Sequence, residues 1–241
     1  MDRVLTEIWV YLAASPLLGL TVTLLAYLIG DALYRKSSQN PLFNPVAIAI
    51  LLLVGLLLGT GTPYQTYFDG AQFVHFLLGP ATVALAIPLY IHADKVRRLL
   101  LPILLALLTG SITAITSAMA LTWLLGGSIQ TVLSMAPKSI TTPVAMGIAE
   151  KIGGLPSLTA VLVIMTGVVG AITANHLLKW LRIGDDSVKG FAIGVASHGI
   201  GTARAFQISE LAGAFAGLAM GLNALLTALL APLMVRLLGL G

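Results

Sequence analysis

The chain alternates long apolar runs with short polar segments, and each run is long enough to cross the ~30 Å hydrocarbon core of a bilayer. Only 9% of its 241 residues are charged, whereas about 25% are charged in a typical soluble domain. The sequence therefore predicts an all-α polytopic membrane protein. The predicted crossings lie near residues 8–33, 43–60, 70–91, 99–125, 156–181, 188–208 and 211–238.

A weaker stretch separates the fourth and fifth runs. Residues 129–136 are apolar but too few to span, Pro137 interrupts them, and residues 140–152 form a second short apolar segment. We predict a re-entrant pair of half-helices that enters and leaves the membrane on the same side. A full crossing here is the alternative, and it would move one basic loop to the opposite side.

Basic residues collect in three loops, and the positive-inside rule places such loops in the cytoplasm. The N-terminus is then expected outside and the C-terminus inside. The net charge of +4 is spread over these loops, which suits a membrane protein and does not favour a nucleic-acid partner. With no cysteine and four dispersed histidines, we expect neither a metal site nor a cofactor. The loops contain Arg35 and Lys36; His92, Lys95, Arg97 and Arg98; and Lys179, Arg182 and Lys189.

The two halves of the chain share a plan, which divides a single domain into a first repeat of about 8–125 and a second of about 129–238. In each half a crossing is followed by a Gly/Pro-interrupted crossing and then a long one, with corresponding crossings expected to run in opposite directions. Inverted repeats with matching broken helices are typical of secondary transporters that work by elevator or rocking movements. Two simply kinked helices are the alternative. The interruptions fall at Gly79, Pro80 and Thr82 and at residues 198–202.

Two polar islands lie among the apolar runs, at residues 138–143 and 197–204. Together with the segments 153–160 and 213–224, these residues resemble the LrgB/CidB family of bacterial inner-membrane proteins. The resemblance covers nearly the whole chain and is densest over 134–232.

The resemblance implies two functions. LrgB-like proteins are described as antiholin-like modulators of murein hydrolase activity and autolysis that act with a small LrgA-like partner. In the plastidial relatives, LrgA-like and LrgB-like parts are fused into a glycolate/glycerate translocator, and bacterial members are linked to pyruvate or glycolate. We therefore expect a transporter of small monocarboxylates or 2-hydroxy acids in the bacterial inner membrane, with the antiholin-like role as the alternative.

The polar islands supply what a small carboxylate needs, namely hydroxyls, helix N-termini and a cation. Glycines let the backbone approach the ligand, and the planar fork of Arg204 matches a carboxylate. The candidate substrate-binding residues are Ser139, Thr141, Thr142, Ser197, His198, Gly199, Gly201, Thr202, Arg204 and Asn223.

Each candidate also has a purely structural alternative. His198 could bond a backbone carbonyl and only fix the break, and Asn223 could cross-link helices. Arg204 could pair with Glu150 or Glu210. The serine and threonines could be helix caps, and the neighbouring Lys138 could extend to the interface.

Coupling, assembly and chemistry complete the predictions. His198, Glu150 and Glu210 are candidates for a proton-linked step. Glycines at 213, 217 and 221, four residues apart, would allow close helix packing or a homodimer surface. No G-x-S-x-G elbow or cysteine nucleophile is present, so we do not expect an enzyme. A holin-like pore is the stronger rival to transport.

Overall fold

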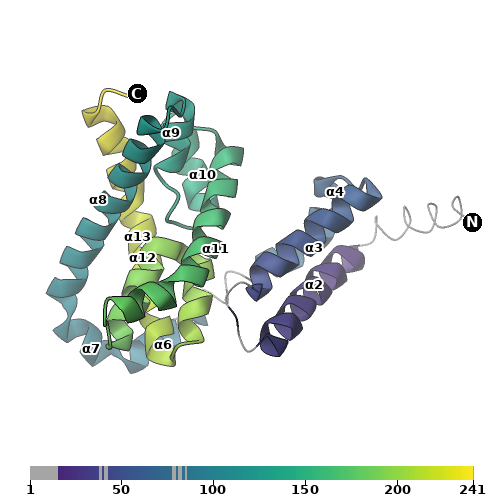
Figure 1. The fold of residues 1–241 in the computed structure, drawn as a ribbon, viewed down its shortest axis with the longest axis horizontal. Coiled ribbons are helices and arrows are strands. Elements are labelled where there is room, and N and C mark those ends of the chain that lie inside the picture. Colours follow the sequence, from purple (N-terminus) through teal and green to yellow (C-terminus); the bar gives the residue numbers. More distant parts are fainter. Residues whose placement is uncertain are drawn as a thin grey trace, which may run out of the picture. The chain divides into compact units, whose positions relative to one another are not determined.

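The computed structural model describes residues 16–37, 40, 43–77, 80, 83–84 and 86–240, and within these ranges it contains helices and no strand (Figure 1). The chain divides into two compact units, residues 1–84 and 85–241. The first contains α2 (Pro16–Lys36), α3 (Pro45–Thr60) and α4 (Tyr64–Phe76). The second contains α6 (Ala86–Ile91), α7 (Ala93–Arg98), α8 (Leu100–Leu124), α9 (Ile129–Met135), α10 (Thr142–Lys151), α11 (Pro156–Trp180), α12 (Asp186–Phe206) and α13 (Glu210–Leu237).

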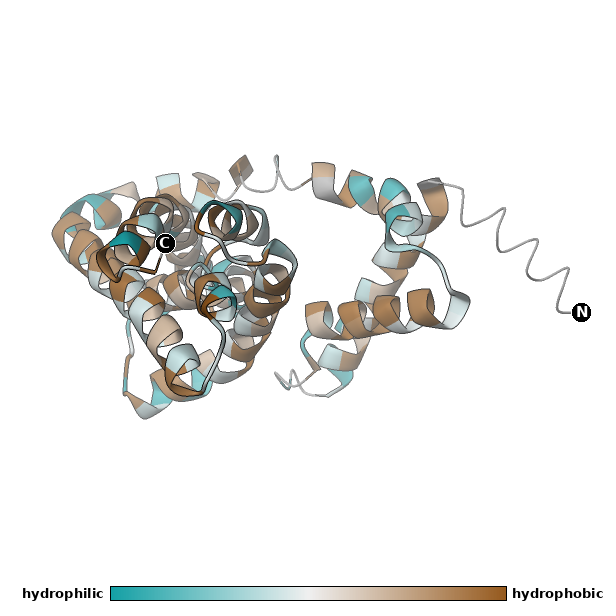
Figure 2. Cartoon of the chain, turned by 90° about the horizontal axis from the view of Figure 1, so that it is seen from above, coloured by the Kyte–Doolittle hydropathy of each residue, from teal (hydrophilic) through white to brown (hydrophobic). Residues whose placement is uncertain are grey.

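Four of these helices are long and apolar enough to cross a membrane, and α3 is a shorter apolar helix. Large hydrophobic side chains remain exposed along them, and Figure 2 shows hydrophobic residues along much of the length of the helices. A multi-pass membrane protein is therefore confirmed, since water would not tolerate so much apolar surface. The four spans are Leu17–Lys36, Leu100–Leu124, Pro156–Trp180 and Glu210–Leu237.

The first unit packs α2 against α3 and α4. Thr23 Oγ1 on α2 lies 2.7 Å from the hydroxyl of Tyr67 on α4. Asn44 begins α3, because its side-chain oxygen accepts from the backbone N–H groups of Val46 and Ala47 at 3.0 and 3.1 Å. The helix α3 agrees with the predicted run 43–60.

Most of the predicted first break lies outside the described residues. Gly79 and Thr82 are among those not described, whereas Pro80 is helical and exposed. The break in the first repeat therefore stays a prediction. The same holds for residues 8–15 of the first predicted crossing.

In the second unit, α9 and α10 form a hairpin, which we call the first hairpin (residues 129–151). Val132 and Ile152, near its two ends, pack in one buried cluster with Met119 from the last part of α8. Both ends of the hairpin therefore lie at the end that α8 has reached. The two predicted half-helices are confirmed within two residues of their expected bounds.

The helix α12 also turns back on itself. Its backbone is non-helical at Ser197 (φ −133°, ψ 16°) and His198 (φ 41°, ψ −136°). A Cβ placed on Gly201 would lie only 2.9 Å from Cγ2 of Ile193, although residues eight apart in a straight helix are separated by about 12 Å. Ala205 and Ile193 also share one buried cluster. We call residues 186–206 the second hairpin.

The predicted crossing over 188–208 is therefore wrong. The glycines and polar residues there do more than kink a spanning helix, because the chain reverses and returns to the end from which it came.

Because of this reversal, α13 runs in the opposite direction to the one predicted from the sequence. Its start packs with the start of α8, through Phe215 and Ile103, and its later part packs with the later part of α8, through Ala231 and Ile115. The two helices thus run parallel, and the C-terminus lies beside α9 (Figure 1).

Two predictions fail for this reason. The runs 99–125 and 211–238 were expected to be antiparallel, and the C-terminus was expected on the side of the basic segment 92–98. Both expectations counted one crossing too many, since the second hairpin does not cross.

Close packing of α12 on α13 uses Gly213, as predicted, together with two glycines of α12 that were not predicted. A Cβ on Gly190 or Gly194 would overlap a backbone oxygen of α13, that of Ala212 or Ala216 respectively. Gly213 faces inward and lies against the ring of Phe206, so it does not form an external surface.

Candidate functional site

The tips of the two hairpins meet at one buried amide. Asn223 Nδ2 on α13 donates to the carbonyl oxygen of Val195 at 2.9 Å and lies 3.5 Å from that of Ser139. Its Oδ1 accepts from Ser111 Oγ of α8 at 2.5 Å and from Thr227 Oγ1 at 3.3 Å. The amide of Asn223 bonds to protein groups on both its nitrogen and its oxygen, and the side chain is 1% exposed. Asn223 therefore cross-links both tips and α8.

His198 holds the reversal of the second hairpin. Its Nε2 lies 2.9 Å from the carbonyl oxygen of Val163 on α11, and since a carbonyl can only accept, Nε2 carries the hydrogen. Thr202 Oγ1 donates to the carbonyl oxygen of His198 itself at 2.8 Å. A residue other than glycine at φ 41° is strained, and these two bonds secure it.

Helix α11 leaves room for the second tip. A Cβ on Gly170 would overlap Ser197 Oγ, and a Cβ on Gly167 would lie 2.7 Å from Cε1 of His198. The second tip can pack this closely against α11 only because α11 has no side chain at these two positions. Sequence reasoning missed both glycines, since nothing in an apolar run marks which glycine faces a distant turn.

The first tip is built differently, from a short linker with its own turns. The backbone N–H groups of Lys138 and Ile140 donate to the carbonyls of Met135 and Pro137, both at 3.3 Å. Lys138 Nζ donates to Ser139 Oγ at 3.1 Å. Thr141 then precedes α10 with no side-chain capping bond.

A cavity of about 400 Å³ lies beside the two tips. It is bounded by the first tip, by α11 and by the second tip, and its lining contains one cation and no carboxylate. Its polar side chains are those of Lys138, Thr166 and Ser197. The remaining lining residues are Met135, Leu162, Met165, Val169, Gly170 and Ala196.

Several predicted residues lie away from this cavity. Arg204 is in the second half of α12, where its Nη1 donates to Gln207 Oε1 at 2.6 Å, and it does not line the cavity. Glu150, near the end of α10, and Glu210, at the start of α13, are exposed and lie at opposite ends of the second unit. Neither carboxylate is therefore placed beside His198.

The other predicted residues lie close to the tips without lining the cavity. Thr141 and Thr142 are half-buried at the start of α10, Gly199 is exposed near Met220, and Gly201 is packed against Ile193. Sequence reasoning placed Lys138 in the first island but left it out of the site, because a lysine in an apolar context often extends to the interface.

In the described part of the chain, no group of three or more histidine, aspartate or glutamate side chains comes together in a way that could hold an ion.

Long apolar helices around two hairpins with polar tips define a multi-pass membrane protein with an internal polar site. The model of the LrgB-like family matches residues 23–237, and the chain belongs to this family. This confirms the resemblance found in the polar islands.

Relatives match along nearly their whole length. YxaC of Bacillus subtilis is 37% identical over 225 residues, which are 93% of this chain and 97% of that protein. YwbG of the same organism is 35% identical over 221 residues, or 91% and 97%. A Bacillus mycoides protein named antiholin-like protein LrgB is 33% identical over 226 residues, or 93% and 98%. No solved structure matches the chain.

Proposed function

We propose that this protein carries a small organic anion, such as a monocarboxylate or 2-hydroxy acid, across the bacterial inner membrane. The anion would occupy the cavity beside the two hairpin tips. The observation that carries the proposal is the position of Lys138, a cation in the lining of a cavity where two re-entrant tips meet. A charge at such a depth is costly and marks a substrate path more often than a structural contact.

The chemistry around Lys138 suits a hydroxy acid. The ammonium supplies charge, the hydroxyls of Ser197 and Thr166 supply hydrogen bonds, and α10 begins just after the first tip with its positive dipole end. We assign the carboxylate to Lys138 in preference to Arg204, because Arg204 lies outside the lining.

The order of elements supports alternating access. The first hairpin follows α8 and starts from the end that α8 reaches, whereas the second hairpin follows α11 and starts from the opposite end. Opposed hairpins of this kind are expected from inverted repeats. In this proposal the repeats are α8 with the first hairpin and α11 with the second, in place of the pairing expected from sequence.

The name of the Bacillus mycoides relative, antiholin-like protein LrgB, favours a second function. In that alternative the protein is antiholin-like and modulates autolysis together with an LrgA-like partner, with or without a homodimer. Transport and an antiholin-like role make different predictions for a purified protein, since only a transporter shows saturable uptake without a partner.

The experiment compares uptake of radiolabelled glycolate, glycerate, pyruvate and lactate into liposomes that contain the purified protein, with and without a proton gradient. Lys138→Gln should reduce uptake ten- to one-hundredfold, as expected for about 1.5–3 kcal/mol from a lost charge-assisted hydrogen bond. Lys151→Gln is the matched control, because Lys151 is exposed at the end of α10. Dye leakage without saturable uptake would reject transport and support a pore.

A further inference from the structure

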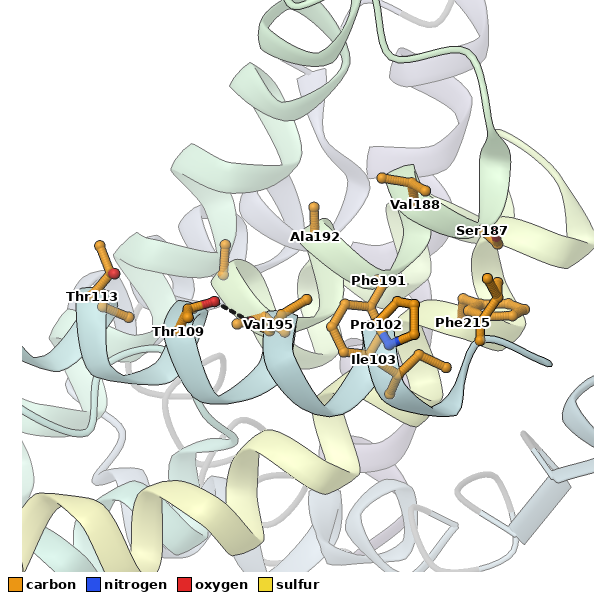
Figure 3. A pocket seen from close by; sticks show the side chains of 15 residues that line it. Pro102, Ile103, Thr109, Thr113, Ser187, Val188, Phe191, Ala192, Val195 and Phe215 are labelled. Carbon is orange, nitrogen blue, oxygen red and sulfur yellow. Dashed lines mark hydrogen bonds between the residues drawn. The ribbon is translucent and has the colours of Figure 1, made fainter. Parts of the chain in front are cut away.

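A second, larger cavity also borders the second hairpin and shares only Ala196 with the cavity beside the tips. It is an open groove of about 680 Å³ between α8, the first half of α12 and the start of α13 (Figure 3). Its walls are almost entirely apolar, with Ile103 and Ala106 from α8, Phe191 and Val195 from α12, and Phe215 from α13. Its lining contains no cation for a small hydrophilic anion, and its only hydroxyls are those of Thr109, Thr113 and Ser187, so the groove is not a second copy of the tip site.

One end of the groove opens into a charged mouth. This adjoining cavity, about 550 Å³, shares Leu99, Ser187 and Val188 with the groove. Four charged side chains line it, two basic and two acidic. They are Asp94, Lys95, Arg98 and Asp185.

Two of the four charged side chains form an ion pair with each other. Lys95 Nζ lies 3.2 Å from both carboxylate oxygens of Asp185 and 6.0 Å from the ring centroid of Phe215. Asp185 also accepts from the backbone N–H of Ser187 at 2.7 Å. This ion pair therefore forms one side of the mouth.

The other two charges have no such partner. Among the described residues, neither Arg98 nor Asp94 makes a side-chain hydrogen bond or ion pair. They lie about one turn apart on α7 and line the same mouth. The mouth thus presents one available guanidinium and one available carboxylate at the end of an apolar groove.

We propose that this groove and mouth bind a phospholipid with a zwitterionic phosphate–ammonium headgroup, as in phosphatidylethanolamine. Arg98 would bind the phosphate through its planar fork, Asp94 would accept from the primary ammonium, and an acyl chain would lie in the groove. Residues Leu99 to Thr113, both in the lining, span about 21 Å of α8 at 1.5 Å per residue. That length covers one leaflet, which is about half of the 30 Å hydrocarbon core.

Charge complementarity selects this headgroup over the two obvious alternatives. Phosphatidylglycerol carries the phosphate but no cation, so it leaves Asp94 without a partner beside added negative charge. Phosphatidylcholine carries a cation with no N–H, so it cannot donate a hydrogen bond to Asp94.

The test is native mass spectrometry of the full chain titrated separately with phosphatidylethanolamine, phosphatidylglycerol and phosphatidylcholine. Arg98→Gln should weaken phosphatidylethanolamine binding at least tenfold, whereas Arg97→Gln, a change at the adjacent exposed arginine that does not line the mouth, should not. Asp94→Asn should remove the preference for phosphatidylethanolamine over phosphatidylglycerol.

The acyl site has its own pair of variants. Ala106→Phe fills the groove and should weaken retention of all three lipids, whereas Leu105→Phe, at an exposed position outside the lining, should not.

Equal binding of the three lipids by the unaltered protein would overturn the proposal, and so would equal effects of the two arginine variants. A preference for phosphatidylglycerol would overturn the headgroup assignment. None of these outcomes bears on anion uptake, so the two proposals fail independently.

Discussion

The two hairpins place their tips at the same depth by different means. The first uses a linker of several residues that makes its own backbone turns, and α10 then starts with Pro143 in its first turn. The second reverses at Ser197 and His198 and depends on groups from α11 and α13. The comparison teaches that the turns of the first tip are made by its own backbone, with a longer contact of 3.5 Å to Asn223, whereas the reversal of the second is held by bonds from α11 and α13.

The largest expected effect tests that dependence at Asn223. Asn223→Leu leaves the carbonyl of Val195 and the hydroxyl of Ser111 buried without the amide, so the free energy of unfolding should fall by about 3 kcal/mol or more, at roughly 1–3 kcal/mol for each orphaned group. Hydrogen exchange should rise more over 190–206 than over 129–151. Asn175→Ala is the control, because Asn175 is only half-buried. Equal exchange in both hairpins would contradict the comparison.

The next largest effect on stability is expected from steric overlap at Gly201. Gly201→Ala places a Cβ 2.5 Å from Cβ of Ser197, which should cost about 1–3 kcal/mol as overpacking. Gly147→Ala in the first hairpin meets nothing within 4 Å and should be neutral or stabilise by about 0.5–1 kcal/mol, as alanine does in helices. Thermal unfolding of the two purified variants measures the difference, and a stable Gly201→Ala protein would show that the reversal is looser than described.

A smaller effect is expected at Ser111. Ser111→Ala removes one donor to Asn223 Oδ1 and leaves Thr227 in place, so the loss should be about 1 kcal/mol. In a double-mutant cycle with Asn223→Leu, the second loss should largely disappear because both changes break the same bond. Additive losses would mean that Ser111 acts through packing.

Effects no larger than that at Ser111 are expected where the two hairpins begin, at Ser128, which caps α9, and at Asp185, which caps α12. The hydrogen bond from Ser187 lowers the pKa of Asp185 to about 2, with Lys95 contributing. A lowered pKa means that the contribution to stability is complete above about pH 4 and is lost as pH falls through 2. Either cap changed to alanine should cost about 1 kcal/mol, but only Asp185→Ala should flatten the acid side of the stability profile. A matching change in Ser128→Ala would refute this assignment.

Sequence reasoning recovered what local chemistry determines. Pro137 and the short apolar runs on either side predicted α9 and α10 closely, and the polar island at 197–204 predicted a break. It could not predict that the break reverses the chain, because the evidence is tertiary: the packing of Gly201 on Ile193 and the space over Gly170.

The candidate site was likewise predicted only where local sequence determines it. The islands identified Ser197 and the neighbourhood of Lys138, but Arg204 was favoured for its fork, and the structure places that side chain beside Gln207. Whether Arg204 or Lys138 faces the cavity depends on the path of the second half of α12 after the reversal. The local sequence does not determine that path.

The reliance of the second hairpin on α13 has a consequence for biosynthesis. Chains are made from the N-terminus, and folding during synthesis follows that order. The first hairpin can close its own turns as soon as it emerges. The second is translated before Asn223, so the Val195 carbonyl gains its partner only when the last helix has been made. Its tip is therefore expected to stay near water or an insertion factor until α13 arrives, and to be the last part of the second unit to settle into the membrane.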